Sequence, residues 1–223
     1  MSEYLSLRLK TIFEMIPENE MVADIGADHG KLMIALIKEN KISHGYAVEN
    51  KKGPYSRLVK ALEKENIIDD VIPLYSDGLT DVPNYVKTIV IAGMGGNAII
   101  DILKKNPSKT KNIQTLIIDA HSALKKVRQE ISNMGFIIAD EKIVKEDDIY
   151  YEIIKFIRAD IAFYNDKELE FGPILVNEKS ATFKEKYSSR IKEIDHLLEN
   201  KGLPMARIEA LKGEKDKIMG VLS

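Results

Sequence analysis

The residue types best suited to hold a ligand and act on it stand together between Asp24 and Gly30, where the sequence reads DIGADHG. This stretch joins an apolar run, Met21 to Ile25, to a helix-like run, Lys31 to Ile37. Gly26 allows backbone angles that a side chain would forbid, and the following helix points its free N–H groups at whatever the turn holds. Such a turn is typical of a nucleotide-like cofactor site, although it also occurs as an ordinary tight turn.

Asp28 decides which cofactor suits this turn. The dinucleotide fingerprint requires three glycines, and Asp28 occupies the place of the second one. A carboxylate at that place repels a pyrophosphate, whereas it suits a cofactor with a cationic sulfonium and a zwitterionic amino-acid tail. We therefore predict S-adenosyl-L-methionine as the cofactor. A nicotinamide-dependent dehydrogenase is a distant alternative, because this chain has Asp28 where that class of enzyme requires a glycine.

Three further motifs follow the later strand-like runs of the chain. Glu49 ends the second run, where an acid commonly accepts hydrogen bonds from ribose hydroxyls. Asp77, within Ser76 to Leu79, follows the third run and could accept from an adenine amino group, although these residues also make a good ordinary turn. Three glycines between Ile91 and Asn97 follow the fourth run and suit a close approach to a flat ligand. Ligands of open α/β sheets lie at the carboxyl ends of the strands, so we expect these motifs to meet there.

Short β-rich runs alternate with helix-length segments, which implies a parallel sheet covered on both faces. The last two runs are joined by a short polar segment, Glu141 to Ile149, and therefore predict an antiparallel hairpin at the sheet edge. Five alternating units and such a hairpin describe a Rossmann-like, seven-stranded class I methyltransferase domain. The predicted strands are Met21–Ile25, Gly45–Glu49, Val71–Tyr75, Thr88–Ala92, Thr115–Asp119, Phe136–Asp140 and Tyr151–Ile157.

Apolar residues take up helical spacing beyond Phe171-Gly172-Pro173, and a stop and a start at residues 201–204 separate two stripes. We expect a C-terminal α-helical hairpin, or short antiparallel coiled coil, whose stripes form the seam between its helices and which could also grip an elongated partner. The chain thus divides into a methyltransferase domain, residues 1–160, and a helical arm, residues 161–223. The stripes are Val176, Phe183, Tyr187, Ile191, Ile194 and Leu198, then Met205, Ile208, Leu211, Ile218 and Leu222.

Composition excludes several classes of function. The 223 residues contain no cysteine, which rules out disulfides, thiolate metal sites, iron–sulfur clusters and cysteine nucleophiles. No apolar run approaches the roughly 18 residues of a membrane span, and the first residues do not resemble a secretion signal, so we expect a soluble, cytoplasmic protein. No second ligand at metal spacing accompanies any of the four histidines, so we predict no metal.

The formal net charge of −2 does not announce a nucleic-acid partner, but the basic residues are unevenly spread. Two clusters placed on one face could follow a phosphate backbone, and lysines on solvated helix faces would give the same pattern. The clusters are Lys104, Lys105, Lys109, Lys111, Lys125, Lys126 and Arg128, and Lys51, Lys52, Arg57 and Lys60.

The motifs together resemble the bacterial tRNA adenine-22 N1-methyltransferase family, most specifically in the Asp-His pair of the opening turn and in the Gly-Met-Gly-Gly loop. The resemblance spans nearly the whole chain. It implies a monomeric methyltransferase that makes 1-methyladenosine at position 22 in the D arm of tRNA, with a coiled-coil arm that helps hold the tRNA. The matching stretches are Leu5–Leu9, Val22–His29, Glu49 with Gly53–Tyr55, Asp77–Leu79, Ile91–Gly96, Glu146–Glu152 and Phe171–Pro173.

This resemblance also implies a set of site residues. We expect cofactor binding by Arg8, Asp24, Gly26, Glu49, Asp77, Gly78 and Gly93, and catalytic roles for Asp28, His29 and Met94. The chain departs from the family at two places near the expected base pocket. It has Asp119-Ala120-His121 where the family usually shows Gln-Pro-Asn, and Lys31 where a tyrosine is usual.

The residues suit attack by a ring nitrogen. Adenine N1 carries an in-plane lone pair, so the transfer needs alignment more than a strong base. Asp28 or a neutral His29 could stabilise the cationic product or take a proton, and Met94 could pack on the base. Two alternatives stay open: a small-molecule methyltransferase of the same fold, and a non-catalytic RNA-binding protein. The acids at three strand ends, Asp24, Glu49 and Asp77, argue against the latter.

Overall fold

The computed structural model describes residues 5–159, 163–200 and 202–223. The chain divides into two compact units, Met1–Phe163 and Tyr164–Ser223. The boundary expected between residues 160 and 161 lies outside the described residues. Within the described residues no helix is long and apolar enough to cross a bilayer.

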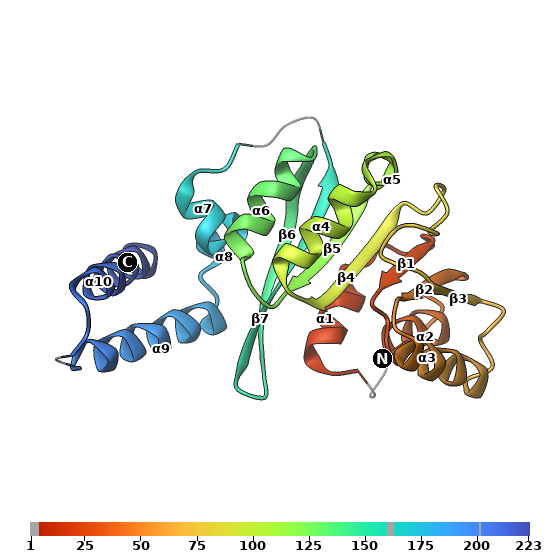
Figure 1. Cartoon of the computed structure of the whole chain (residues 1–223), viewed down its shortest axis with the longest axis horizontal. Coiled ribbons are helices and arrows are strands. Elements are labelled where there is room, and N and C mark those ends of the chain that lie inside the picture. Colours follow the sequence, from red (N-terminus) through yellow and green to blue (C-terminus); the bar gives the residue numbers. More distant parts are fainter. Residues whose placement is uncertain (1–4, 160–162, 201) are drawn as a thin grey trace. The chain divides into compact units, whose positions relative to one another are not determined.

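The first unit is built on seven strands: β1 (Val22–Ile25), β2 (Gly45–Glu49), β3 (Val71–Tyr75), β4 (Thr88–Met94), β5 (Thr115–Ala120), β6 (Phe136–Glu146) and β7 (Ile149–Arg158). They form one sheet of order β3-β2-β1-β4-β5-β7-β6 (Figure 1). The first five strands pair in parallel, and β7 runs antiparallel to both of its neighbours. The predicted seven-stranded Rossmann-like fold with an edge hairpin is confirmed.

The strand order reverses between β1 and β4, because β2 and β3 extend the sheet to one side and β5 to the other. Every residue of β1, β2 and β5 is buried, as expected for central parallel strands covered on both faces. Ligands of such sheets bind outside the carboxyl ends of the strands at the reversal point. The fold therefore directs attention to the residues that follow β1, β2, β4 and β5.

The hairpin of β6 and β7 is longer than the sequence suggested. The polar segment from Glu141 to Ile149 was expected to connect the two strands, but Glu141–Glu146 pairs with β7 as strand. The turn consists of Asp147 and Asp148, both with positive φ. The expectation was wrong because polar side chains also occupy strand positions in this hairpin. Buried and more exposed residues largely alternate along β6, as the two faces of a strand require.

The helices of the first unit are α1 (Leu7–Met15), α2 (Lys31–Lys38), α3 (Lys52–Lys64), α4 (Gly96–Lys105), α5 (Pro107–Asn112) and α6 (Leu124–Asn133). One core cluster joins Ile12 of α1, Leu36 of α2 and Leu58 of α3 to inward residues of the sheet such as Val90 and Ile117. Among the helices, α1 packs against α2 and against the hairpin strands, whereas α4 packs against α6. The start of α1 is fixed by Ser6, whose Oγ accepts from the Leu9 N–H at 3.3 Å.

One member of the predicted basic clusters proves to be a core residue. The Arg128 side chain of α6 is fully buried, and its Nε donates to Glu141 Oε1 at 2.8 Å and its Nη2 to Glu152 Oε2 at 2.5 Å. The two glutamates come from β6 and β7, so this buried ion triad connects the helix to the hairpin. Arg128 therefore cannot contribute to a surface that binds phosphate, and that part of the cluster interpretation was wrong.

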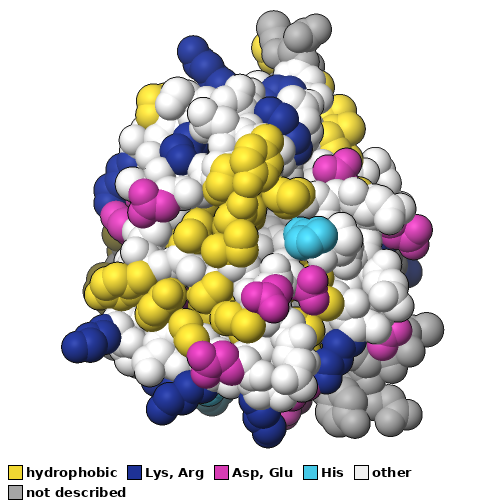
Figure 2. Space-filling view, turned by 90° about the vertical axis from the view of Figure 1, so that its right-hand side faces the viewer, with side chains coloured by type: hydrophobic (Ala, Val, Ile, Leu, Met, Phe, Trp, Pro, Cys, Tyr) yellow, Lys and Arg dark blue, Asp and Glu magenta, His cyan; other side chains and the backbone are white. Residues whose placement is uncertain are grey.

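The sheet ends at β3, and the face around this edge is partly hydrophobic. Figure 2 shows a band of hydrophobic side chains on one face of the molecule. Ile72 and Tyr75 of the edge strand, and Tyr85 after it, are exposed large hydrophobic residues. Tyr85 hydrogen-bonds through its hydroxyl to Tyr46 of β2. Pro73 in the middle of β3 lacks an N–H, as suits a strand at a sheet edge.

In its described residues, 164–200 and 202–223, the second unit has four helices: α7 (Asp166–Phe171), α8 (Pro173–Glu178), α9 (Ala181–Leu198) and α10 (Met205–Leu222). α9 and α10 pack on each other, with Arg190 Nε donating to Glu214 Oε1 at 2.7 Å and Lys215 bridging to Asp195. The predicted helical hairpin is confirmed, whereas a coiled-coil geometry stays a prediction.

The first apolar stripe of the arm was assigned too far toward the N-terminus. Val176 lies in α8 rather than in α9. The chain breaks between these helices because Lys179 adopts a left-handed conformation and the Ser180 Oγ caps α9 by accepting from the Phe183 N–H at 3.2 Å. In the second stripe Met205 is 71% exposed, so it does not belong to the seam.

Candidate active site

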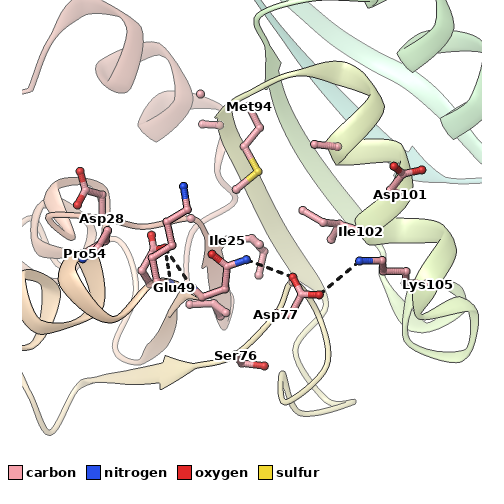
Figure 3. A pocket seen from close by; sticks show the side chains of 18 residues that line it. Ile25, Asp28, Glu49, Pro54, Ser76, Asp77, Met94, Asp101, Ile102 and Lys105 are labelled. Atoms are coloured by element: carbon pink, nitrogen blue, oxygen red, sulfur yellow. Dashed lines mark hydrogen bonds and ion pairs between the residues drawn. The ribbon is translucent and has the colours of Figure 1, made fainter.

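Two cavities open at the carboxyl ends of the central strands. The larger one has a volume of about 540 Å³ and the smaller one about 280 Å³. Their walls share Gly26, Asp28 and Ala92, so the cavities meet at the turn after β1 and at the end of β4. Figure 3 shows the larger cavity with Glu49 and Asp28 on one side and Met94 and Ile102 on the other.

All ten predicted site residues line one of these cavities or both. Seven line the larger cavity: Gly26, Asp28, Glu49, Asp77, Gly78, Gly93 and Met94. The smaller cavity is lined by Arg8, Asp24 and His29, together with Gly26 and Asp28. Chain topology thus brings together residues spread over the first 94 positions, and the individual roles given to them stay predictions.

Gly26 shapes the floor between the two cavities. Its φ is +81°, in the region that L side chains rarely adopt, and its N–H donates to the Val48 carbonyl at 2.8 Å. A Cβ at this position would stand 2.4 Å from the Met94 methyl group. The flexible Met94 side chain can move, but the backbone angle cannot be relieved, so the angle is what requires glycine.

Glu49 is a buried carboxylate with one oxygen held by the backbone. Its Oε1 accepts from the N–H groups of Asn50 and Lys51 at 3.0 and 3.2 Å. These bonds fix the side chain at the end of β2, while Oε2 takes no hydrogen bond from a described residue. A positioned, partly unsatisfied acceptor of this kind suits a ligand that brings hydroxyl donors.

Asp77 closes the far end of the larger cavity between two walls. Its Oδ1 accepts from the Asn50 Nδ2 at 3.3 Å, and its Oδ2 lies 3.4 Å from the Lys105 Nζ of α4 (Figure 3). Gly78 follows with φ +58°, and a Cβ there would lie 3.0 Å from Ile102. The same residues also form a turn, since the Asp77 carbonyl accepts from the Thr80 N–H and Oγ1.

Asp24 is the most perturbed acid of the site. It lies buried at the wall of the smaller cavity, and burial, with a further contribution from the nearby charge of Glu49, raises its pKa from 3.8 to about 7. Ionisation of Asp24 is therefore held back in the free protein. A cationic ligand group beside it would favour the carboxylate form and thereby gain affinity.

Asp28 and His29 form the exposed lip of the site. Asp28 has φ +39°, and its Oδ1 accepts from the Arg57 Nη2 of α3 at 2.9 Å. The His29 Nε2 lies 3.6 Å from the Asp28 Oδ2. Arg57 had been assigned to a basic cluster, and the structure instead uses it to orient the carboxylate that both cavities share.

The glycines at and after the end of β4 have two different roles: Gly93 shapes the cavity, and Gly96 allows close packing. Gly93 forms a β-bulge with φ +77°, placed between Ala92, which pairs with Asp119, and Met94, which pairs with Ala120. The bulge turns Met94 over the larger cavity. Gly96 begins α4, and a Cβ there would lie 2.4 Å from the Ser122 carbonyl oxygen, so this glycine is required by packing rather than by a ligand.

Arg8 reaches the same region from α1 and is held by three residues. Its Nη1 donates to the buried Asp119 Oδ2 at 2.8 Å and lies 3.4 Å from the His121 Nε2. Its Cζ stands 5.1 Å from the centroid of the Tyr151 ring, and His121 meets that ring edge-on.

Sequence reasoning missed several of these partners. Asn50 gave no motif signal, and Lys105 and Arg57 were expected only as members of basic clusters, because their acidic partners come from other strand ends. A signal did exist at Asp119 and His121, whose types depart from the resembled family. Tyr151 belongs to a predicted hairpin strand, and its place beside Arg8 depends on the sheet order.

The fold and the joined cavities are those of a class I methyltransferase domain, and residues 5–154 match the methyltransferase domain family. The tRNA (adenine(22)-N(1))-methyltransferase of Bacillus subtilis (strain 168) is 30% identical over 201 residues, which cover 87% of this chain and 84% of that relative. The chain belongs to the tRNA (adenine(22)-N(1))-methyltransferase family. The resemblance drawn from the motifs is confirmed.

Two solved structures agree with this assignment over nearly the whole chain. Sp1610 of Streptococcus pneumoniae in complex with S-adenosyl-L-methionine has a TM-score of 0.89 and 27% identity, covering 98% of this chain and all of the other. TrmK of M. capricolum in complex with S-adenosyl-homocysteine has a TM-score of 0.86 and 25% identity, covering 97% and 96%. Both span the helical arm as well as the sheet.

Proposed function

We propose that this protein transfers a methyl group from S-adenosyl-L-methionine to N1 of adenine 22 in the D arm of tRNA. The observation that carries the proposal is the set of acids at successive strand ends around two joined cavities, in a chain that belongs to the tRNA (adenine(22)-N(1))-methyltransferase family. The enzyme is thus a tRNA (adenine-N1)-methyltransferase.

The residues present fit the two ends of the cofactor. In the larger cavity Glu49 would accept from ribose hydroxyls through its available Oε2, and Asp77 from the adenine amino group. In the smaller cavity Asp24 would hold the ammonium and Arg8 the carboxylate of the amino-acid tail. Gly26, Gly78 and Gly93 keep the walls free of side chains. When bound, S-adenosyl-L-methionine supplies the methyl group that is transferred.

The acceptor base would lie beside Asp28, which lines both cavities, with Met94 at the larger cavity and His29 at the smaller one. Adenine N1 needs no activated nucleophile, so these residues act by orientation and by charge. Asp28, oriented by Arg57, would stabilise the positive charge that the ring gains or accept a proton from the amino group, and His29 would share this task. Met94 would pack against the base.

The tRNA itself is the partner implied by this chemistry. Adenine 22 lies in a stem, so the base must leave the stack at a cost of a few kcal/mol, which backbone contacts have to offset. We propose that the helical arm helps to grip the tRNA and that a monomer acts in the cytoplasm, where tRNA is found. Lys51 at the larger cavity and Lys31 at the smaller one are cations available to phosphates near the site.

The test is a methylation assay with defined RNA. The full chain is incubated with S-adenosyl-L-methionine and an unmodified tRNA transcript carrying adenine at position 22, with a guanine-22 transcript as the matched control. Nucleosides are then identified by mass spectrometry. We expect 1-methyladenosine from the adenine transcript alone. Tight cofactor binding without methylation would overturn the substrate and favour the small-molecule alternative, and absence of cofactor binding would favour the non-catalytic one.

A further inference from the structure

We infer that Asp119 and His121 are positioning residues that hold Arg8 as a clamp for the carboxylate of the cofactor's amino-acid tail. The clamp would make the protein select a cofactor that carries this carboxylate. The inference rests on the proposed use of S-adenosyl-L-methionine and adds residues at which the chain departs from the resembled family.

Asp119 is a buried carboxyl group paired with the Arg8 guanidinium. It ends β5 with its side chain fully buried, and its Oδ1 has no hydrogen-bond partner among the described residues. Burial raises its pKa, and Arg8, His121 and the backbone N–H of Gly93 act in the opposite direction. A buried carboxylate that depends on one guanidinium holds that guanidinium firmly in return, because losing the pair leaves a buried charge uncompensated.

The other contacts of Arg8 fix its direction. His121 Nε2 lies within 3.4 Å of the same Nη1, and the Tyr151 ring lies beside the guanidinium plane at 5.1 Å. The backbone of α1 is held as well, since the Leu7 N–H donates to Glu146 Oε1 of the hairpin at 2.8 Å. Two segments far from α1 in the sequence, residues 119–121 and the hairpin of β6 and β7, therefore hold Arg8 and the start of its helix.

The position that results leaves half of the guanidinium available. All described hydrogen bonds of Arg8 use Nη1, so the edge formed by Nε and Nη2 has no partner among the described residues. Arg8 is 23% exposed and lines the smaller cavity with Asp24. A planar edge with two parallel N–H donors matches a carboxylate bidentately, and Asp24 beside it matches an ammonium. Together they recognise an amino-acid zwitterion.

An aspartate and a histidine serve this purpose better than two amides would. The Asp119 side chain accepts a hydrogen bond from the Arg8 guanidinium as an ion pair, and such a charge-assisted bond is stronger than one accepted by a neutral amide oxygen. His121 Nε2 faces a guanidinium nitrogen that can only donate, so it is placed to accept. The two residues orient Arg8 without touching the cofactor themselves.

Binding of two ligands to the full chain tests the clamp. S-adenosyl-homocysteine carries the carboxylate, and its decarboxylated analogue lacks only that group, so calorimetry gives the ratio of the two dissociation constants. We expect the wild type to prefer the carboxylate form by at least tenfold, and Arg8→Ala to remove the preference. Asp119→Asn should lower the preference about tenfold while leaving the affinity for the decarboxylated ligand within about twofold, as a charge-assisted bond replaced by a neutral one implies.

The exposed His121 provides a variant whose folding is not at issue. His121→Ala should lower the preference, and His121→Asn, which keeps an acceptor, should restore most of it. Equal loss of both ligands in Asp119→Asn, or an unchanged preference in both Asp119→Asn and His121→Ala, would overturn the inference. A wild type that binds both ligands equally would overturn the clamp but keep the proposed cofactor, whereas a wild type that binds neither would overturn the proposed function.

Discussion

Substitution of Asp24 by asparagine should stabilise the fold and weaken the cofactor site at the same time. The buried carboxylate has a pKa of about 7 in the folded chain against 3.8 as its ordinary value, with burial as the main cause and the charge of Glu49 as the second. Above pH 7 the folded protein therefore carries an unfavourable buried charge. Asparagine has nearly the same shape and no charge, so it removes that cost.

The magnitude follows from the shift in pKa. A rise of about 3 pKa units corresponds to a cost of about 4 kcal/mol when Asp24 is ionised in both the folded and the unfolded chain. At pH 5 the folded carboxyl is protonated while the unfolded one is ionised, and the cost shrinks to about 1–2 kcal/mol. Folded Asp24 binds more protons than unfolded Asp24 between these pKa values, so its contribution to stability falls as the pH rises from about 4 to about 7.

Urea denaturation of the wild type and Asp24→Asn at pH 5, 6, 7 and 8 measures this cost. The variant should be more stable throughout, and its advantage should grow by about 2–3 kcal/mol between pH 5 and pH 8. Calorimetry should show that S-adenosyl-homocysteine binds the wild type more tightly as the pH rises toward 7, and that the variant binds it weakly at every pH, because the amide cannot offer a charge to the ammonium.

The matched control is Asp77→Asn. It removes another acid of the same site, but the Asp77 side chain is 60% exposed. Its stability should stay within about 0.5 kcal/mol of the wild type with no dependence on pH beyond that of the wild type. A constant difference between Asp24→Asn and the wild type across the pH range, or a less stable Asp24→Asn, would refute the assignment of a buried, neutralised carboxyl to this position.

Three further substitutions have defined outcomes. Asp28→Asn should lower kcat for tRNA methylation by about 100-fold or more, while the affinity for S-adenosyl-homocysteine changes little. Arg57→Ala removes only the orienting ion pair and should lower kcat less than tenfold, so equal effects of the two variants would contradict the assigned roles. Gly26→Ala should abolish cofactor binding even when combined with Met94→Ala, because the strain lies in the backbone angle; recovery in the double variant would show a steric cause. Arg128→Met should cost about 3–5 kcal/mol of unfolding free energy in urea, because two buried glutamates lose their counter-charge; a loss below 1 kcal/mol would show that water reaches them.

The parts of the fold that follow local rules could be predicted from the sequence. The predicted strands ending at Glu49 and Tyr75 match the structure at both ends, because the change from a β-rich run to a polar turn marks the end of a strand in the sequence. The break between α8 and α9 could not be predicted in the same way. It depends on one left-handed lysine, Lys179, where no glycine or proline marks the change of direction.

Buried polar residues set the other limit. Glu141 and Arg128 read as solvent-exposed from their types, and each is buried because the other supplies the opposite charge. Neither can be assigned to the core alone, because the partners lie on different elements and the pairing exists only after the hairpin has packed against α6. Sequence patterns that treat residues one at a time therefore misplace both members of such a pair.

The candidate site shows the same division between local and distant information. Asp24, Gly26 and Glu49 stand at strand ends, where the fold class alone predicts their position, and all three line the cavities. Arg8 and Asp119 are separated by 111 positions, and only the sheet order brings α1 beside the end of β5. The first group determines which class of cofactor the site suits. In the proposed clamp the second group sets how firmly the cofactor's tail is held, so we expect differences in cofactor selectivity between relatives to trace to residues of this distant kind.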